Sequence, residues 1–254
     1  MLASVNCQDV IDWLESELKP SHFKDYAPNG LQVSGRKNIS QIVSGVSVSQ
    51  ALIQAAIDCQ ADMLLVHHGC FWQGEKRTLV GHQRERMAML LAHDINLVAY
   101  HLPLDAHARW GNNVCLAKLL NIEVQGLMPG HDPALGRYGQ LAAPQSPKDF
   151  VTQITQQLQR QPLHIAGQSA MIQSVGLSTG ADQDGILHAA DMGLDAFISG
   201  EVSERTTYLA RELGVHYFAA GHHATERYGV QALGAALAEK FNITHTYIEI
   251  DNPV

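Results

Sequence analysis

Hydrophobic positions along the chain alternate between helical and extended spacing, and this pattern predicts most of its elements. Apolar residues at helical spacing over residues 6–18, followed by Pro20, predict an opening helix. The pair Asn29-Gly30 predicts a turn into a short extended segment, and residues 41–48 are predicted to form the first full strand. The chain is therefore expected to form a helix first and then to enter a sheet.

Beyond residue 50, short apolar strands alternate with helices, which is the pattern of βαβ units in a parallel sheet. In the first half the predicted helices are 50–60 and 84–93, and the predicted strands are 63–66 and 96–100. In the second half the predicted strands are 174–179, 196–199 and 215–219, and the predicted helices are 184–192 and 203–213. A predicted helix at 226–241 and an alternating strand at 244–250 follow them.

The two halves share a weak sequence repeat. The matching positions, in order, are Ala56, Asp58 and Asp62 in the first half and Ala189, Asp191 and Asp195 in the second. Together with the matched order of elements, the repeat predicts an α/β fold of two similar lobes from an internal duplication. We place the first α/β lobe at residues 1–127, a linker at 128–148 and the second α/β lobe at 149–254, because four prolines and three glycines fall within the linker.

The composition is that of an ordinary globular protein, and it bounds the location and the partners. The chain of 254 residues is 46% hydrophobic and 17% charged, which suffices to bury a core. Apolar runs fall short of the roughly eighteen residues of a membrane span. Acidic residues among the first twenty positions are unlike a signal peptide, so we expect a cytoplasmic protein without a membrane partner. The net charge of -8 disfavours nucleic acid as a partner, although a local basic face stays open.

Cysteine and histidine usage indicates nitrogen and oxygen ligands for any metal. The four cysteines lie far apart without a CxxC pair, which argues against a disulfide framework and a thiolate zinc site. Histidine occurs 14 times, clusters in a few short segments, and is the commonest metal ligand in proteins. Cys70 is a conceivable nucleophile, but a packed thiol is the favoured interpretation. Gly45-Val-Ser-Val-Ser lacks the second glycine of a GxSxG nucleophile elbow, and P-loop and GxGxxG motifs are absent from the sequence.

Candidate ligands follow four of the predicted strands. Ligands of open α/β sheets bind beyond the carboxyl ends of the strands, where loops carry the chemistry. The candidates at these ends are His67 and His68, His101 with Asp105, Glu201, and His222 and His223 with Glu226. Because these ends belong to both predicted lobes, we expect a shared site in the cleft between the lobes.

Each candidate residue also has an interpretation in which it binds no metal ion. A single histidine after a buried strand is usually a hydrogen-bonded turn residue, Asp105 suits a turn cap, and His107 suits an exposed position. His222 and Glu226, four residues apart, lie on one face of a helix, which fits a metal motif, a surface ion pair or a capping contact. For Glu201 the alternative is a buried ion pair between the lobes. The convergence of several such elements favours a metal site.

The predicted metal ligands are His67, His68, Asp105, His222 and Glu226. Histidines with carboxylates suit zinc, iron, manganese, cobalt or nickel. Five ligands exceed the three that a mononuclear catalytic zinc usually keeps, so we predict two divalent ions about 3.5 to 4 Å apart. Such a pair polarises an amide, imine or phosphate bond, which predicts hydrolysis. Glu201 is the candidate catalytic base, and His101 and His223 are candidates for proton transfer or ligand support.

Five sequence blocks carry a family resemblance. They are Tyr26-Ala-Pro-Asn-Gly-Leu-Gln-Val, Val66-His-His-Gly-Cys-Phe-Trp, His101-Leu-Pro-Leu-Asp-Ala-His, Ile198-Ser-Gly-Glu-Val-Ser-Glu and Ala220-Gly-His-His-Ala-Thr-Glu-Arg. With these blocks, nearly the whole chain resembles the GTP cyclohydrolase I type 2 homolog family, also called NIF-three-like or YbgI-like. The chain lacks the large insertion of longer relatives and has Gly69 where many relatives have proline. Neither departure touches a predicted ligand.

The resemblance implies two related α/β lobes, a dinuclear metal centre and a ring-shaped homohexamer with its sites facing an internal cavity. By motif it implies the same five ligands, with Glu226 as the bridge. Two functions stay open from the sequence. One is a metal-dependent hydrolase acting on a nucleotide or related heterocycle as its small-molecule substrate. The other is a non-enzymatic metal-binding ring that binds protein or nucleic acid.

Overall fold

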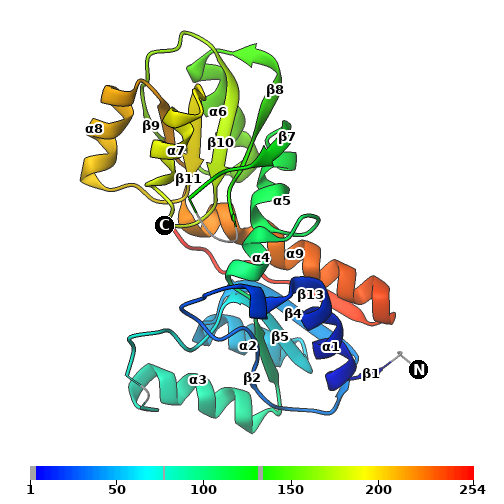
Figure 1. Ribbon diagram of the computed structural model, residues 1–254. Helices are drawn as coiled ribbons and strands as arrows, with labels where there is room; N and C mark the ends of the chain where they lie inside the picture. The colour runs from blue at the N-terminus through cyan, green and yellow to red at the C-terminus, as the bar shows by residue number, and fades with distance from the viewer. Residues whose placement is uncertain (1–3, 77, 131–133) are drawn as a thin grey trace. The chain divides into compact units, whose positions relative to one another are not determined.

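The computed structural model describes residues 4–76, 78–130 and 134–254. The chain divides into two compact units. The first unit comprises Met1–Leu104 and Gly229–Asp251, and the second comprises Asp105–Tyr228 and Asn252–Val254. The long helix α9 (His222–Phe241) therefore begins in the second unit and continues into the first (Figure 1).

The first unit is built around a five-stranded sheet in the order β13-β4-β5-β6-β2. Its strands are β2 (Gly30–Val33), β4 (Gln41–Ser47), β5 (Met63–His68), β6 (Asn96–Ala99) and β13 (Thr244–Tyr247). Only β2 runs antiparallel to its neighbour among these five strands. The other elements are β1 (Val5–Asn6), β3 (Asn38–Ile39), α1 (Cys7–Leu18), η1 (Pro20–His22), α2 (Gln50–Asp58) and α3 (Gly81–Ala92).

The core of the first unit holds the carboxyl ends of β5 and β6 in place. Helix α2 contributes Leu52 and Ile53 to a buried cluster that also contains Leu64 of β5 and Leu97 of β6. Strands β5 and β6 are almost fully buried, as central strands of a parallel sheet are expected to be. The residues that follow these strands therefore start from a rigid base.

The second unit contains a six-stranded sheet in the order β7-β8-β10-β11-β12-β9. Its strands are β7 (Ile122–Leu127), β8 (Arg137–Gln145), β9 (Leu163–Ile165), β10 (Ile172–Ser178), β11 (Ala196–Ser199) and β12 (His216–Ala219). Strands β10, β11 and β12 are parallel, and the outer strands pair antiparallel. The helices are α4 (Leu102–Ala106), which begins before the unit boundary, α5 (Asn112–Leu119), α6 (Pro147–Leu158), α7 (Gly185–Asp191) and α8 (Glu204–Leu213).

Alternate residues of the second sheet face two separate cores. Phe218 of β12 packs into a cluster with Phe150 and Ile154 of α6. Its neighbour Tyr217 packs into another cluster with residues of α7 and α8. Because successive side chains of a strand point to opposite faces, helices cover both faces of this sheet.

The elements predicted from the hydrophobic pattern are present, with two shifts that concern the site. Strand β5 continues through His68 rather than ending at residue 66, and helix α9 begins at His222 rather than at residue 226. The elements that were not predicted are β1, η1, β3, β7, β8, β9, α4, α5 and α6. Helix α6 carried a usable signal, because Phe150, Ile154 and Leu158 repeat every four residues behind a Ser146 cap.

The division into units differs from the predicted lobes at 1–127 and 149–254 with a linker at 128–148. Residues 131–133 of that linker lie outside the described residues, but β8 (Arg137–Gln145) falls within it and pairs with both β7 and β10. A Cβ at Gly139 would lie 2.1 Å from the carbonyl oxygen of Glu123, so glycine serves close strand pairing there. The observed division falls at Leu104 and Asp105 instead.

Asp62 and Asp195, which the sequence repeat aligns, make equivalent hydrogen bonds in the two units. Oδ2 of Asp62 accepts from Ser40 N at 2.8 Å, Ser40 Oγ at 2.8 Å and Gln41 N at 3.1 Å. Oδ2 of Asp195 accepts from Ser174 N at 2.9 Å, Ser174 Oγ at 2.8 Å and Gln173 N at 3.0 Å. In each unit, an aspartate before the second parallel strand ties down the start of the first.

Replacing Asp62 or Asp195 with alanine is expected to lower the free energy of unfolding by about 1–3 kcal/mol. Burial alone would raise the pKa of both carboxyl groups. The hydrogen bonds that the carboxyl groups accept outweigh burial and lower the pKa, and for Asp62 these include a bond from Arg36. Since the folded-state pKa is depressed, this stability is present above about pH 4 and is lost as pH falls through the folded pKa.

Urea unfolding at pH 7 and at pH 3 measures this effect. Asp58→Ala is the control because Asp58 is exposed, and its change should stay within about 0.5 kcal/mol. A variant at Asp62 or Asp195 that is as stable as the control at pH 7 contradicts the structural role.

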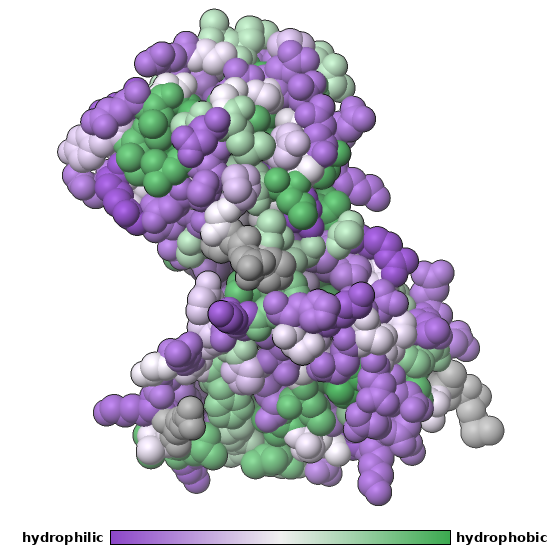
Figure 2. Space-filling view, viewed as in Figure 1, coloured by the Kyte–Doolittle hydropathy of each residue, from purple (hydrophilic) through white to green (hydrophobic). Residues whose placement is uncertain are grey.

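Among the described residues, every helix is too short or too polar to cross a membrane. On the face shown in Figure 2, hydrophilic side chains predominate and hydrophobic ones form separate patches.

Candidate metal centre

Three histidines gather at the carboxyl end of the first sheet. His67 and His68 are the last residues of β5, and His101 follows the neighbouring parallel strand β6. One ring nitrogen from each lies within 4.8 Å of the others, and His67 is fully buried. Because adjacent parallel strands end at the same edge of a sheet, the fold itself brings these side chains together.

Each of the three rings is oriented by a hydrogen bond at Nδ1. His67 Nδ1 donates to the carbonyl oxygen of Tyr100 at 2.9 Å, and His68 Nδ1 is 2.8 Å from Ser47 Oγ. His101 Nδ1 lies 2.7 Å from Asp25 Oδ1. Metal-binding histidines usually use one ring nitrogen in this way and coordinate through the other. The cluster therefore has the chemistry of a site that coordinates through Nε2.

Asp25 was not among the predicted residues, yet it is central to this cluster. Its carboxylate accepts from His101 Nδ1, from Asn29 Nδ2 at 3.0 Å and from Leu102 N at 3.0 Å. Burial alone would raise the pKa of Asp25, but the hydrogen bonds and the charge of His101 outweigh it and lower the pKa. In the sequence, the only sign of this role is that Asp25 immediately precedes the block Tyr26-Ala-Pro-Asn-Gly-Leu-Gln-Val. Its partner His101 is 76 positions away, so the local sequence does not connect the two residues.

In the second unit, His222 and Glu226 lie one turn apart at the start of α9. His222 Nε2 is 3.1 Å from Glu226 Oε2, and Glu226 is only 3% exposed. His222 Nδ1 donates to Glu201 Oε1 at 2.7 Å. Burial alone would lower the pKa of His222, but hydrogen bonds and charges from Glu226 and Glu201 raise it to about 9. Two carboxylates therefore converge on a half-buried histidine, and their negative charges attract a proton or a metal ion to it.

Asp105 lies beside this pair. It is buried, and one of its oxygens lies within 4.8 Å of a Glu226 oxygen. Asn112 Nδ2 donates to Asp105 Oδ1 at 2.8 Å, and Thr179 Oγ1 lies 3.3 Å from the same atom. These two supporting residues were missed in the sequence, because neither residue type is distinctive for a metal site. Asp105 is a buried carboxylate fixed by neutral donors, rather than a simple turn cap.

Gly180 makes room for Glu226. It has a positive φ of +68°, and a Cβ at this position would lie 2.1 Å from Glu226 Oε1 and 3.2 Å from His222 Nε2. Its N–H is held by Thr225 Oγ1 at 3.1 Å. The backbone conformation favours glycine here, and a larger residue would displace the Glu226 carboxylate from this position.

The remaining candidates have structural roles in the described contacts. His107 Nδ1 accepts from Trp110 N at 3.1 Å, and its ring stacks on the Trp110 indole. His223 is buried, and its backbone N–H donates to the Val254 carbonyl oxygen at 3.0 Å. Burial raises the pKa of the Cys70 thiol to about 11, which agrees with a packed thiol and disfavours a nucleophile.

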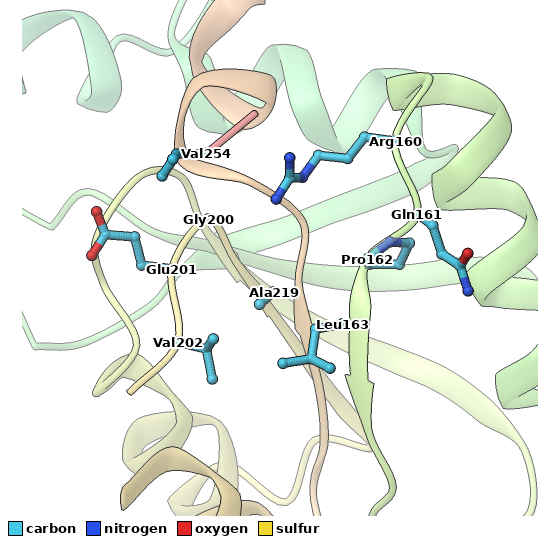
Figure 3. A pocket seen from close by; sticks show the side chains of 9 residues that line it. All are labelled: Arg160, Gln161, Pro162, Leu163, Gly200, Glu201, Val202, Ala219 and Val254. Carbon is cyan, nitrogen blue, oxygen red and sulfur yellow. The ribbon is translucent and has the colours of Figure 1, made fainter. Parts of the chain in front are cut away.

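A cavity of about 740 Å³ lies beside Glu201 in the second unit (Figure 3). Its lining residues are Arg160, Gln161, Pro162, Leu163, Gly200, Glu201, Val202, Ala219 and Val254. Glu201 comes from the loop after β11, and Arg160 reaches in from the segment between α6 and β9. Tyr217 Oη donates to the Glu201 carbonyl oxygen at 2.6 Å and fixes that loop. Glu201 therefore lines this cavity and also accepts a hydrogen bond from His222.

The fold and these side-chain groups define a mixed α/β protein with histidine and carboxylate groups that could hold metal ions. The sequence pattern of the Duf34/NIF3 (NGG1p interacting factor 3) family matches residues 5–253, and the chain belongs to this family. This confirms the family resemblance noted in the sequence.

Relatives with similar sequences carry the name GTP cyclohydrolase 1 type 2 homolog. The protein of that name from Vibrio cholerae is 52% identical over 243 residues, covering 95% of this chain and 96% of its own. The one from Pseudomonas aeruginosa is 48% identical over 246 residues, covering 96% of this chain and 97% of its own.

Solved structures share the fold. A protein described as ybgI, of unknown function, aligns with a TM-score of 0.95 and 43% identity, covering 98% of this chain and 100% of its own. TTHA1606 from Thermus thermophilus aligns with a TM-score of 0.89 and 29% identity, again covering 98% of this chain and 100% of its own. Both alignments extend through both units of this chain.

Proposed function

We propose that the chain is a metal-dependent hydrolase that acts on a nucleotide or a related heterocycle. The observation that carries the proposal is the set of oriented donors at the strand ends of both units. Divalent ions held by these donors would act as Lewis acids that polarise the bond to be hydrolysed. The donor chemistry fits such ions, because imidazole nitrogens and carboxylate oxygens suit zinc, iron, manganese, cobalt or nickel.

The proposed ligands are His67, His68, Asp105, His222 and Glu226, holding two ions in one site between the two lobes. Glu226 is proposed as the bridging ligand. Thr179 and Asn112 support this assignment, because they fix the Asp105 carboxylate without adding a competing positive charge, and Gly180 leaves room for the Glu226 carboxylate. The equivalent roles of Asp62 and Asp195 support the further proposal that the two lobes arose by duplication.

Two residues are proposed to handle protons. Glu201 orients His222 through Nδ1 and borders the cavity in Figure 3, which places a carboxylate base next to space for a substrate. His101 is held by Asp25, and a histidine backed by a carboxylate is suited to accept and release a proton.

The proposed assembly is a ring-shaped homohexamer with its sites facing an internal cavity. The family resemblance supports this assembly. A small-molecule substrate suits it, because a site facing an enclosed space admits small molecules more readily than folded partners.

The test is metal-dependent turnover. Protein loaded in turn with zinc, manganese, iron, cobalt and nickel is assayed against a panel of nucleotides and nitrogen heterocycles, before and after chelation. We expect hydrolysis of at least one compound that stops on chelation and returns with metal. Protein that holds metal but turns over no member of the panel contradicts the hydrolase and favours the non-enzymatic ring.

Glu201→Gln is expected to lower kcat about 100-fold while metal content stays near the wild-type value. Glutamine keeps an oxygen that accepts from His222 Nδ1, but it cannot take up a proton at neutral pH. Steady-state kinetics and elemental analysis of the same preparation measure the two effects separately. The control is Glu204→Gln, an exposed residue at the start of α8, which should leave both values unchanged. An unchanged kcat in Glu201→Gln excludes the proposed base.

A further inference from the structure

Another cavity, of about 710 Å³, lies in the first unit next to the cluster of His67, His68 and His101. Three aromatic side chains line it, namely Tyr26, Phe71 and Trp72, and the buried Met87 of α3 also contributes to its wall. The cavity borders the segment between β5 and α3, which is cyan in Figure 1. Its size falls in the range of small-molecule sites, which is roughly 300–1,000 Å³.

The aromatic rings of this pocket are exposed to an unusual degree. Tyr26 is 51% exposed and Phe71 is 38% exposed. Aromatic side chains of this size are more often buried, because burial removes their apolar surface from water. Exposed apolar side chains that gather around a hollow are typical of a binding site rather than of inert surface. Flat rings also bind flat ligands, because stacking adds about 1–3 kcal/mol for each base.

Two residues of the pocket contact the histidine cluster. The Trp72 ring lies edge-on to the His101 ring, with centroids 5.1 Å apart, and 5.6 Å from the His68 ring. Asp25 lines the pocket and also holds His101 Nδ1. A ligand stacked in the pocket would therefore extend toward the candidate metal ligands.

The pocket is also preformed and has polar groups at its rim. Gln73 N donates to the Tyr26 carbonyl oxygen at 2.7 Å, which joins the two loops that carry the aromatic rings. Gln83 Nε2 donates to Glu75 Oε2 at 3.2 Å, so amide and carboxylate groups face the same space. Such groups can pair with the N–H and C=O edges of a nitrogen heterocycle, whereas a hydrocarbon ring offers them no hydrogen bond.

We infer that this aromatic pocket binds the planar nitrogen heterocycle of the substrate and presents the substrate to the histidine cluster. Presentation of the substrate to the histidine cluster rests on the proposed function. Binding of the heterocycle in the pocket does not, because stacking of the ring does not require turnover. It assigns Tyr26, Phe71 and Trp72 as specificity-determining residues. A bicyclic ring such as a purine fits the combination of flat walls and polar rim.

Equilibrium dialysis of metal-loaded full-length protein tests the inference. The probes are guanosine 5′-monophosphate, adenosine 5′-monophosphate and ribose 5-phosphate, which shares their phosphate but has no base. We expect wild type to bind at least one nucleotide tenfold or more tightly than ribose 5-phosphate. Tyr26→Ala and Phe71→Ala should remove most of this difference and leave ribose 5-phosphate binding unchanged.

Tyr208→Ala is the matched control, since Tyr208 is 54% exposed and lies on α8 in the other unit. Equal binding of nucleotides and ribose 5-phosphate by wild type overturns the inference. So does a pocket variant that binds nucleotides like Tyr208→Ala. Sedimentation of each variant adds one more outcome, because pocket variants that lose assembly but not nucleotide binding would make this surface a subunit contact.

The outcomes separate this inference from the proposed function. Base-dependent binding that depends on Tyr26 and Phe71, without hydrolysis of any compound, supports the pocket and contradicts the hydrolase. Metal-dependent hydrolysis with the same KM in wild type, Tyr26→Ala and Phe71→Ala supports the hydrolase and contradicts the pocket.

Discussion

Replacing Glu226 with alanine is expected to remove bound metal and, with it, all metal-dependent activity. Wild type purified with metal should hold about two ions per chain, and the variant a small fraction of that. Glu226 is 3% exposed, lies 3.1 Å from His222 Nε2 and has an oxygen within 4.8 Å of an Asp105 oxygen, so its loss removes the carboxylate that both of these groups approach. Elemental analysis after desalting measures the metal, and thermal unfolding checks that the variant is folded.

Glu239→Ala is the control, because Glu239 is an exposed carboxylate on the same helix α9. It should keep the full metal content. His68→Ala removes a donor from the first unit and should also lower the metal content if donors of both units serve one site. Folded Glu226→Ala protein that holds as much metal as Glu239→Ala would refute the ligand assignment.

The fold could be predicted from the sequence where hydrophobic periodicity is strong. Strands β4, β5, β6, β10, β11 and β12 are rich in apolar residues, and all of them were located within a few residues. Strand β8 was mistaken for linker because Gly139 and Pro144 within it, and the other glycines and prolines around it, look like loop signals. Gly139 is in fact needed for close contact with β7, which is a tertiary requirement that local sequence cannot reveal.

The site could be predicted only as far as residue chemistry is distinctive. Histidine and acidic residues after parallel strands identified the candidate ligands, because topology gathers such residues at one sheet edge. Asp25 could not be recognised, since its role depends on a hydrogen bond to His101, 76 residues along the chain. Asn112 and Thr179 were missed for the same reason, because an amide or hydroxyl gains its role only from the carboxylate it contacts.

Gly180 is the clearest case of a residue whose role only the fold reveals, and its replacement gives the second large effect. Gly180→Ala is expected to abolish metal binding although no proposed ligand is changed. The new Cβ would lie 2.1 Å from Glu226 Oε1, so the carboxylate must leave its position. Elemental analysis should show a metal content as low as that of Glu226→Ala.

Backbone strain alone must be separated from this displacement, because alanine at positive φ costs about 1–2 kcal/mol wherever it occurs. Gly193→Ala provides that separation. Gly193 has φ +67°, nearly the same as the +68° of Gly180, but a Cβ there would meet no atom within 4 Å. Both variants should lose similar stability in urea unfolding, while only Gly180→Ala should lose metal. Equal metal content in the two variants would mean that the Glu226 carboxylate does not hold the ions. A metal loss confined to Gly180→Ala would trace the effect to the Glu226 carboxylate, because φ is nearly the same at both positions.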